Sequence, residues 1–327
     1  MRLSTTLLST AASLSLAACM MNTSHVREEK KEPTRKEKLE IYTTTATYLY
    51  DDGSLTRAQD QAVKALELDP GNKSMRRMIG WIRLRLGKSE DLLIAERFFR
   101  DLLREGDENE ATILGLATTV ERLGLGYDQA RRRVESGEQR PAADYAALAT
   151  ANWTEAAKHY ESTLTNGEGS TAAMNGLQRT YALLGRYEES LSWTDRLIER
   201  STAELATWRR LLTGKDLTRR EEKLYRDNER IARRLQVETH LFASTLLHSL
   251  GSVEGAIEHL NAVVVEDPDL PQAYSLRAQL LAKTGSYDLA ISDIDRFLAL
   301  SDAPFEEPSI RRAFELRGEC QTALAQR

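Results

Sequence analysis

A motif that recurs every 34 residues constrains this chain more than any other feature. It consists of a glycine, a large residue, a small residue and an aliphatic residue, and its two clearest copies are Gly251, Val253, Ala256, Leu260 and Gly285, Tyr287, Ala290, Ile294. The same step links Ala151 and Trp153 to Gly185 and Tyr187. A fixed period of this length is typical of a repeat array, which builds an extended surface from stacked units. The period therefore predicts a binding protein before any single residue is considered.

The units of the array are predicted to be helical from about residue 39 onward. Residues 257–265 and 290–300 have apolar side chains three and four residues apart, which is the spacing of one helix face. Breaks are expected at glycines inside a unit and at Asp69-Pro70 and Asp267-Pro268 between units. The sequence thus indicates pairs of helices joined by short turns.

This arrangement resembles the tetratricopeptide repeat, whose units are helix pairs of this length. Small residues fall where the two helices of each pair would touch, at Ala58, Ala95, Ala130, Ala156, Ser190, Ala256 and Ala290. A small side chain there allows the two backbones to approach closely. The resemblance implies an all-α fold, a right-handed superhelical solenoid of tetratricopeptide-like helix pairs.

The steps between these small residues are 37, 35, 26, 34, 66 and 34, so the array is irregular. The step of 26 predicts a second helix that is cut short near 128–136, after a turn at Gly124-Leu125-Gly126. The step of 66 predicts a degenerate basic unit at 205–236. The predicted order is an N-terminal array of about five units at 39–204, this degenerate unit, two units at 237–304 and a C-terminal capping helix within 305–327.

The N-terminus resembles the signal of a bacterial lipoprotein. Residues 1–18 are mostly apolar or small and end in Leu16-Ala17-Ala18, directly before Cys19. In that family the cysteine is acylated and the signal is removed, and Met20 in place of an aspartate favours the outer membrane. The resemblance implies a lipid anchor at Cys19, a charged tether at 19–38 and a protein that faces the periplasm. The alternative is an ordinary secretory signal with a chance cysteine.

The sequence contains no catalytic or metal-binding motif, and we expect neither enzyme activity, nor a cofactor, nor a metal. The five histidines form no metal-ligand pattern, and Cys320 is expected to be a packing residue. The net charge is −5, so the overall charge gives no reason to expect nucleic acid as a partner.

The resemblance also implies that the first helix of each unit lines a concave groove. The residues predicted to bind a partner there are Arg77, Trp81, Tyr145, Asn175 and Arg179. The same positions in later units hold Leu241, Thr245, His248, Ser275 and Gln279. Arginine forks and amides suit an extended peptide that is acidic or ends in a carboxylate. The alternative is that Trp81 and Tyr145 pack between helices and the arginines lie along the surface.

A second candidate site is the basic stretch 205–236, which has ten Lys or Arg against five acids. The predicted patch is Arg219, Arg220, Arg230, Arg233 and Arg234. One interpretation is a solvated helix with ion pairs between successive turns. The other is a docking surface for an acidic protein or an anionic cell-wall polymer.

Together these features predict a non-catalytic, membrane-anchored scaffold of the cell envelope that binds an extended peptide of an envelope protein. Such a scaffold would serve the assembly of pilus, secretion or outer-membrane machinery. The alternative is a polymer-binding component of peptidoglycan regulation or exopolysaccharide export.

Overall fold

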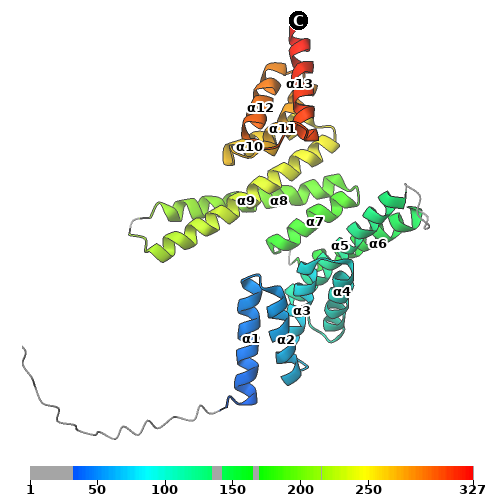
Figure 1. Ribbon diagram of the computed structural model, residues 1–327, viewed down its shortest axis with the longest axis vertical. Coiled ribbons are helices and arrows are strands. Elements are labelled where there is room, and N and C mark those ends of the chain that lie inside the picture. The colour runs from blue at the N-terminus through cyan, green and yellow to red at the C-terminus, as the bar shows by residue number, and fades with distance from the viewer. Residues whose placement is uncertain (1–31, 135–141, 165–168, 215, 327) are drawn as a thin grey trace, which may run out of the picture.

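The computed structural model describes residues 32–134, 142–164, 169–214 and 216–326. The predicted signal at 1–18, the predicted lipidation site Cys19 and most of the tether lie outside the described residues. Across the described ranges the chain forms α-helices and no strand (Figure 1). The predicted all-α solenoid is therefore confirmed.

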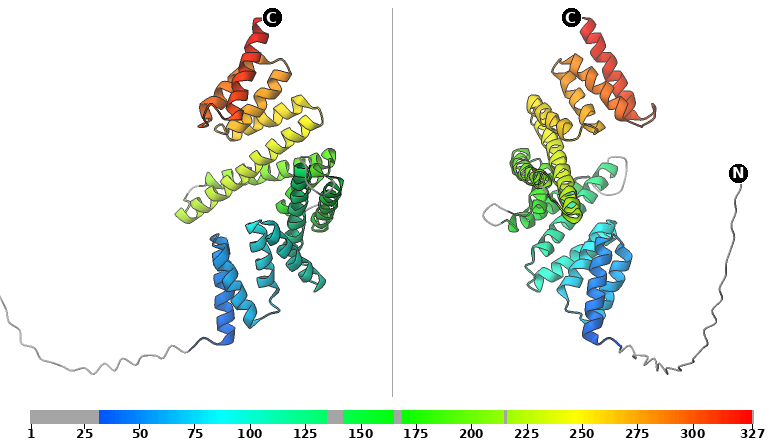
Figure 2. Two further views of the ribbon diagram at one scale, coloured as in Figure 1. Left: turned by 45° about the vertical axis from the view of Figure 1, so that its right-hand side comes forward. Right: turned by 90° about the vertical axis from the view of Figure 1, so that its left-hand side faces the viewer.

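Thirteen helices follow one another along the described parts of the chain. The first seven are α1 (Arg35–Asp51), α2 (Leu55–Leu68), α3 (Lys73–Leu86), α4 (Ser89–Arg104), α5 (Glu110–Val134), α6 (Ala142–Ser162) and α7 (Thr171–Leu183). The remaining six are α8 (Tyr187–Leu212), α9 (Arg219–Ser249), α10 (Val253–Glu266), α11 (Pro271–Lys283), α12 (Tyr287–Leu300) and α13 (Pro308–Ala325). Neighbouring helices pack in pairs, and the pairs stack from α1 at one end to α13 at the other (Figures 1 and 2).

Small residues at the helix contacts explain how the pairs close. The predicted positions Ala58, Ala95, Ala156, Ser190, Ala256 and Ala290 are fully buried. Ala130, which the sequence places in the same series, is only partly buried. The exception lies at the step of 26 residues, where the expected helix pair does not form.

Residues 110–136 and 137–170, which the sequence divides into two units, form a single pair of long helices. α7 ends beside Gly185, whose φ of +74° suits glycine, and α8 begins two residues later. Ala151 occupies the corresponding place in α6 and favours the helix, so α6 continues through it. A side chain at this one position therefore converts a helix–turn–helix unit into one helix.

The turn expected at Gly124-Leu125-Gly126 does not form, because α5 passes through it without a break. Gly124 serves packing instead: a Cβ there would lie 2.5 Å from Nε1 of Trp153 on α6. The glycine thus lets an indole ring lie directly against the α5 backbone. The second helix expected to be short near 128–136 is in fact the end of a 25-residue helix as far as Val134.

The degenerate unit expected at 205–236 is also absent as a separate unit. Its residues lengthen α8 to 26 residues and α9 to 31 residues, and the two helices form a hairpin that projects from the stack (Figure 1). The extensions pack on each other, with Trp208 and Tyr225 rings 6.0 Å apart. We call the part of this hairpin within 205–236 the basic hairpin.

The last helix, α13, begins at Pro308 as the sequence predicts. It packs against α12 and α11 through Ile310, Ala313 and Cys320, which confirms that Cys320 is a packing residue. Phe314 of the same helix is 44% exposed and rests against the ring of Phe305. The array therefore ends on a single helix.

Candidate functional site

Arg77 on α3 is the first predicted groove residue, and it already has a carboxylate partner. Its guanidinium donates to both oxygens of Asp107 at 2.8 and 3.0 Å, and its Nε donates to Thr112 at 2.7 Å. Burial is the largest influence on Asp107 and raises its pKa, but hydrogen bonds from Thr112 and Arg77 outweigh it and leave that pKa below its usual value. The fork of Arg77 is therefore occupied by an ion pair between neighbouring units.

Trp81, one turn further along α3, packs between helices. Its Nε1 donates to the carbonyl of Ala111 at 3.1 Å, and its ring meets Phe99 edge-on with centroids 5.8 Å apart. This is the alternative role that the sequence allowed for Trp81. Part of the ring still lines a hollow of about 390 Å³ between α3 and its neighbours.

Arg179 on α7 likewise holds a buried acid. It donates through Nε and Nη2 to the two oxygens of Glu121 on α5, at 2.8 and 2.9 Å. The hydroxyl of Tyr160 on α6 donates to the same carboxylate at 2.7 Å. Burial, followed by the charge of Glu121, raises the pKa of Tyr160, so the phenol remains a hydrogen-bond donor. Three helices are joined at this carboxylate, which is only 4% exposed.

The other two predicted groove residues contribute less to a common surface. Asn175 accepts a hydrogen bond from Gln178 on its own helix at 2.9 Å, and Tyr145 is half-buried on α6. Arg77 and Trp81 line one hollow together. Arg77 and Arg179 instead form ion pairs that join neighbouring parts of the array.

A better-formed groove lies along the last helices. Three adjoining hollows of about 370, 100 and 110 Å³ follow α9, α11 and α13. Gln279 lines all three, Lys283 lines two of them, and Arg312 with Leu316 lines two. We call this surface the C-terminal groove.

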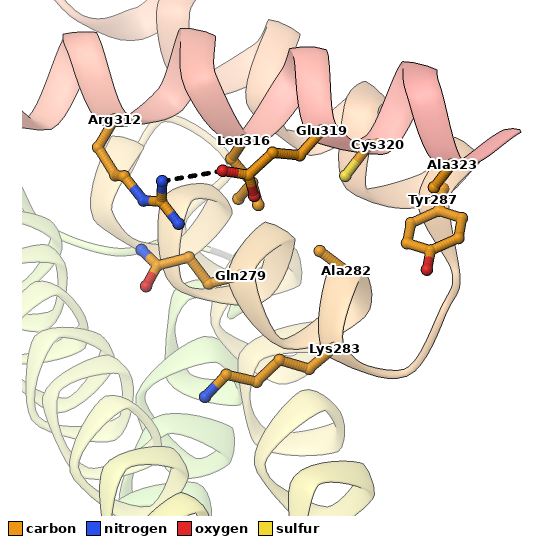
Figure 3. Close-up of a pocket in the computed structure, with 9 residues that line it drawn as sticks. All are labelled: Gln279, Ala282, Lys283, Tyr287, Arg312, Leu316, Glu319, Cys320 and Ala323. Carbon is orange, nitrogen blue, oxygen red and sulfur yellow. Dashed lines mark hydrogen bonds and ion pairs between the residues drawn. The ribbon is translucent and has the colours of Figure 1, made fainter. Parts of the chain in front are cut away.

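The polar centre of the C-terminal groove is a lysine without an acid partner. Within the described residues Lys283 has no ion pair, and its ammonium donates to Nε2 of His248 on α9 at 3.1 Å. Beside it, the exposed amide of Gln279 faces the same space (Figure 3). Arg312 on α13 is shared between Glu315 and Glu319, at 3.2 and 3.1 Å. An anionic group entering here would meet Lys283 and Arg312, and the Glu319 carboxylate that lines the same hollow is already paired with Arg312.

The hollow that Lys283, Arg312 and Glu319 line also has an apolar side. Tyr287, Leu316, Cys320 and Ala323 surround the largest hollow (Figure 3). Burial raises the pKa of the Cys320 thiol, which keeps it in its neutral, apolar form. A charged centre beside an apolar recess suits a peptide that carries both an anionic group and an aliphatic side chain.

The repeat spacing identified part of this groove. Of the five expected inner positions, Thr245, His248, Ser275 and Gln279 line its hollows. The fifth, Leu241, packs against the apolar residues of α10 instead. Lys283 and Arg312 were missed. Lys283 lies one turn beyond Gln279 at the end of α11, and Arg312 lies on a helix expected to be a polar cap.

The basic hairpin combines both interpretations that the sequence allowed. Arg230 pairs with Asp227 and Arg234 with Glu238, both along the helix, as expected of a solvated surface. Arg219, Arg220 and Arg233 are exposed and, in the described parts of the chain, form no ion pair. Three of the five predicted patch residues are therefore available to a partner.

No set of three His, Cys, Asp or Glu side chains in the described ranges is arranged to hold a metal ion. A search of those same ranges for a helix both long and apolar enough to cross a bilayer found none.

Comparison with known proteins agrees with this architecture. Residues 145–204 and 243–307 match the model of the tetratricopeptide repeat family. A search of curated proteins gave no match. These two segments are tetratricopeptide repeats, and the comparisons indicate no enzymatic family.

Three solved structures illustrate the similarity in fold. A thermophilic tetratricopeptide repeat protein of Thermus thermophilus is 14% identical, with a TM-score of 0.42 over 75% of this chain and 99% of that one. A repeat protein of Parabacteroides merdae is 17% identical, with a TM-score of 0.38 over 86% and 99%. YrrB, described as having an unusual peptide-binding site, is 15% identical, with a TM-score of 0.34 over 86% and 98%.

Proposed function

We propose that this protein is a non-catalytic scaffold of the bacterial cell envelope, which binds an extended peptide segment of a partner protein in its C-terminal groove. The observation that carries the proposal is the position of Lys283: an exposed ammonium with no carboxylate partner in the described chain, at the meeting point of two hollows. Tetratricopeptide repeats are protein-interaction modules, and such an array offers a long inner surface to which a partner can bind.

The groove favours a peptide with an acidic or C-terminal carboxylate next to an aliphatic side chain. The carboxylate would accept hydrogen bonds from Lys283 and Gln279, and the side chain would enter the recess beside Tyr287 and Leu316. Ser275 and Thr245 supply hydroxyls along the same line for the peptide backbone.

The envelope location rests on the N-terminal motif that ends at Cys19. Lipidation there would anchor the chain to the outer membrane, facing the periplasm, and several acyl chains would make the attachment lasting. Tethering would raise the local concentration of any bound partner at the membrane. Replacing Cys19 with Ser should release the protein from the membrane fraction, and unchanged fractionation would contradict the anchor.

The peptide groove is tested by site-specific photo-crosslinking in intact cells. A photoreactive residue at Ser275, inside the groove, should capture a partner protein. The same residue at Val265, which is 77% exposed on α10, serves as the control position and should not. Adding Lys283→Ala should abolish the cross-link at Ser275. Equal capture at both positions, or capture that survives Lys283→Ala, would reject the proposed groove.

Polymer binding for peptidoglycan regulation or exopolysaccharide export is the alternative, and it depends on the basic hairpin. Leu224 and Ile231 are 54% and 65% exposed there, among the arginines. Aliphatic side chains gain little from a hydrated sugar polymer, because its surface is mostly polar. The peptide-binding scaffold therefore remains the conclusion.

A further inference from the structure

The basic hairpin is the part of the described molecule that extends farthest to one side of the stack. The outer halves of α8 and α9 run beside each other away from the other helices, in both the first view and the turned one (Figures 1 and 2). A convex projection of this kind can reach a flat surface without a collision of the body. It does not enclose a small ligand.

The charge of the hairpin is opposite to that of the rest of the chain. Residues 205–236 carry ten Lys or Arg and five acids, a net charge of +5. The whole chain has a net charge of −5, so everything outside this segment sums to −10. An anionic surface would attract the hairpin and repel the remainder, which selects one orientation of the protein.

The unpaired cations lie on the outer part of α9. Arg219, Arg220, Lys223 and Arg233 are exposed, and among the described residues none of them has an ion-pair partner. The paired arginines, such as Arg226 with Glu222 at 2.7 Å, lie between them. Free cations bind anions without first giving up an internal partner.

Two aliphatic side chains stand exposed among these cations. Leu224 and Ile231 are seven residues apart, about two helical turns, so they share one face of α9. They are 54% and 65% exposed, while Tyr225 and Ala232, next to them in sequence, turn toward α8 or the interior. Arg220 precedes Leu224 by four residues and Arg234 follows Ile231 by three, so these two cations continue the same face, with Lys223 at its edge. Arg233, nine residues from Leu224, lies on the opposite side of α9.

We propose that this face of the basic hairpin lies against an anionic lipid bilayer. Aliphatic side chains that enter the boundary of the bilayer, together with cations at the depth of the headgroups, are the combination that binds a helix to such a surface. A sugar polymer would use the cations and leave Leu224 and Ile231 in water. The contact is a second attachment, independent of both the peptide groove and the acylation of Cys19.

The test uses the full chain carrying Cys19→Ser, so that no acyl group contributes. The protein is sedimented with vesicles of phosphatidylglycerol and phosphatidylethanolamine, and separately with vesicles of phosphatidylcholine alone. Binding is expected only to the anionic vesicles and should fall at high salt, because the attraction is screened. Absence of binding to anionic vesicles at low salt would overturn the proposal.

Two hairpin variants and one matched control locate the contact. The charge variant, which removes unpaired cations of α9, is Arg219→Gln, Arg220→Gln, Lys223→Gln and Arg233→Gln. The control removes as many exposed cations from α2, α4 and α6, and consists of Arg57→Gln, Lys64→Gln, Arg97→Gln and Lys158→Gln. Each cation near the surface changes affinity about fivefold, so the charge variant should lose more than about tenfold, while the control should be unchanged or only slightly weaker. Equal losses would reject the hairpin as the contact.

The apolar variant, Leu224→Ser with Ile231→Ser, separates lipid from polymer. It should weaken vesicle binding about threefold or more, because two aliphatic side chains no longer enter the bilayer. Retention on peptidoglycan or an anionic polysaccharide should not depend on it. Retention on such a polymer without vesicle binding would assign the hairpin to the polymer and contradict the proposal. All three variants change exposed residues, so unchanged melting confirms that each remains folded.

Discussion

The two halves of the array use inner-face cations in opposite ways. In the N-terminal half, Arg77 forms an ion pair with Asp107 and Arg179 forms one with Glu121, and each ion pair joins two helices of the array. In the C-terminal half, the Lys283 ammonium donates to Nε2 of His248, forms no ion pair within the described residues and faces open space. The cations on the inner helix faces therefore hold helices together in the N-terminal half, whereas in the C-terminal half the cation can bind a partner.

The largest expected effect on stability comes from removing the ion pair between Arg179 and Glu121. Arg179→Ala leaves the Glu121 carboxylate, 4% exposed, with Tyr160 as its remaining partner. We expect the free energy of unfolding to fall by about 3 kcal/mol, because a buried charge without its partner is costly. Urea denaturation measures it. Arg186→Ala, at an exposed pair with Glu189, is the control and should cost less than about 0.5 kcal/mol. A similar small value for Arg179→Ala would remove the distinction between the halves.

A smaller effect is expected from the close contact of α5 with α6. Gly124→Ala would place a Cβ 2.5 Å from Trp153, and we expect a loss of about 2 kcal/mol from overpacking. Gly126→Ala, two residues on, meets nothing within 4 Å and should stabilise the helix by about 0.5 kcal/mol. Thermal melting of the two variants gives the comparison. If both variants are stabilised, the indole does not lie against α5 as described.

A third effect concerns the junction between the halves, where His240 of α9 and His259 of α10 share a hydrogen bond between their Nδ1 atoms at 2.8 Å. Burial, then the nearby His259, lowers the pKa of His240 from 6.5 to about 4, and burial also lowers that of His259. The other charged groups that influence the pair are Asp195 of α8 and, on α10, Glu258 and Glu266.

Because the unfolded chain takes up these protons first, stability is highest above pH 6.5 and falls as the pH drops toward 4. Solvent screening reduces the effect to roughly 1–2 kcal/mol. The measurement is the unfolding free energy at pH 7 and pH 4.5 for the wild type and for His240→Gln. The variant should lose less on acidification, and an identical loss would show that the pair does not titrate as described.

The smallest effect on stability is expected in the C-terminal groove. Lys283→Ala removes an exposed side chain with one hydrogen bond and should change the unfolding free energy by less than about 0.5 kcal/mol. The same variant should lose the partner cross-link at Ser275. A large loss of stability would mean that Lys283, like Arg179, is a structural tie.

The period in the sequence was sufficient to predict the regular units. α10 and α12 contain the segments 257–265 and 290–300 that the sequence predicts to be helical, and Gly251 and Gly285, with φ of +83° and +76°, end the helices before them. The period failed where Ala151 replaces the glycine and where 205–236 has no stop signal within each helix. There the number of units was inferred from spacing alone, and spacing does not distinguish a missing turn from a missing unit.

The site was harder to predict because a sequence shows which cations face inward but not which acids they meet. Arg77 and Asp107 are 30 residues apart, and Arg179 and Glu121 are 58 apart. Nothing local marks either pair. Lys283 differs from these arginines because no carboxylate pairs with it in the described residues. The sequence does not show this, since the partner depends on how the helices pack.

One consequence follows from the length of α9. Its 31 residues form a single rod of about 46 Å, which carries Arg220 near one end and His248 near the other. Because the helix is continuous, the directions of the side chains at its two ends are fixed relative to each other. Inserting one residue between them would rotate the hairpin face by about 100° relative to the groove, whereas inserting seven would nearly restore it. The number of residues in α9 thus sets the angle between the hairpin face and the C-terminal groove. Natural variants of this helix should therefore differ in length by whole helical turns.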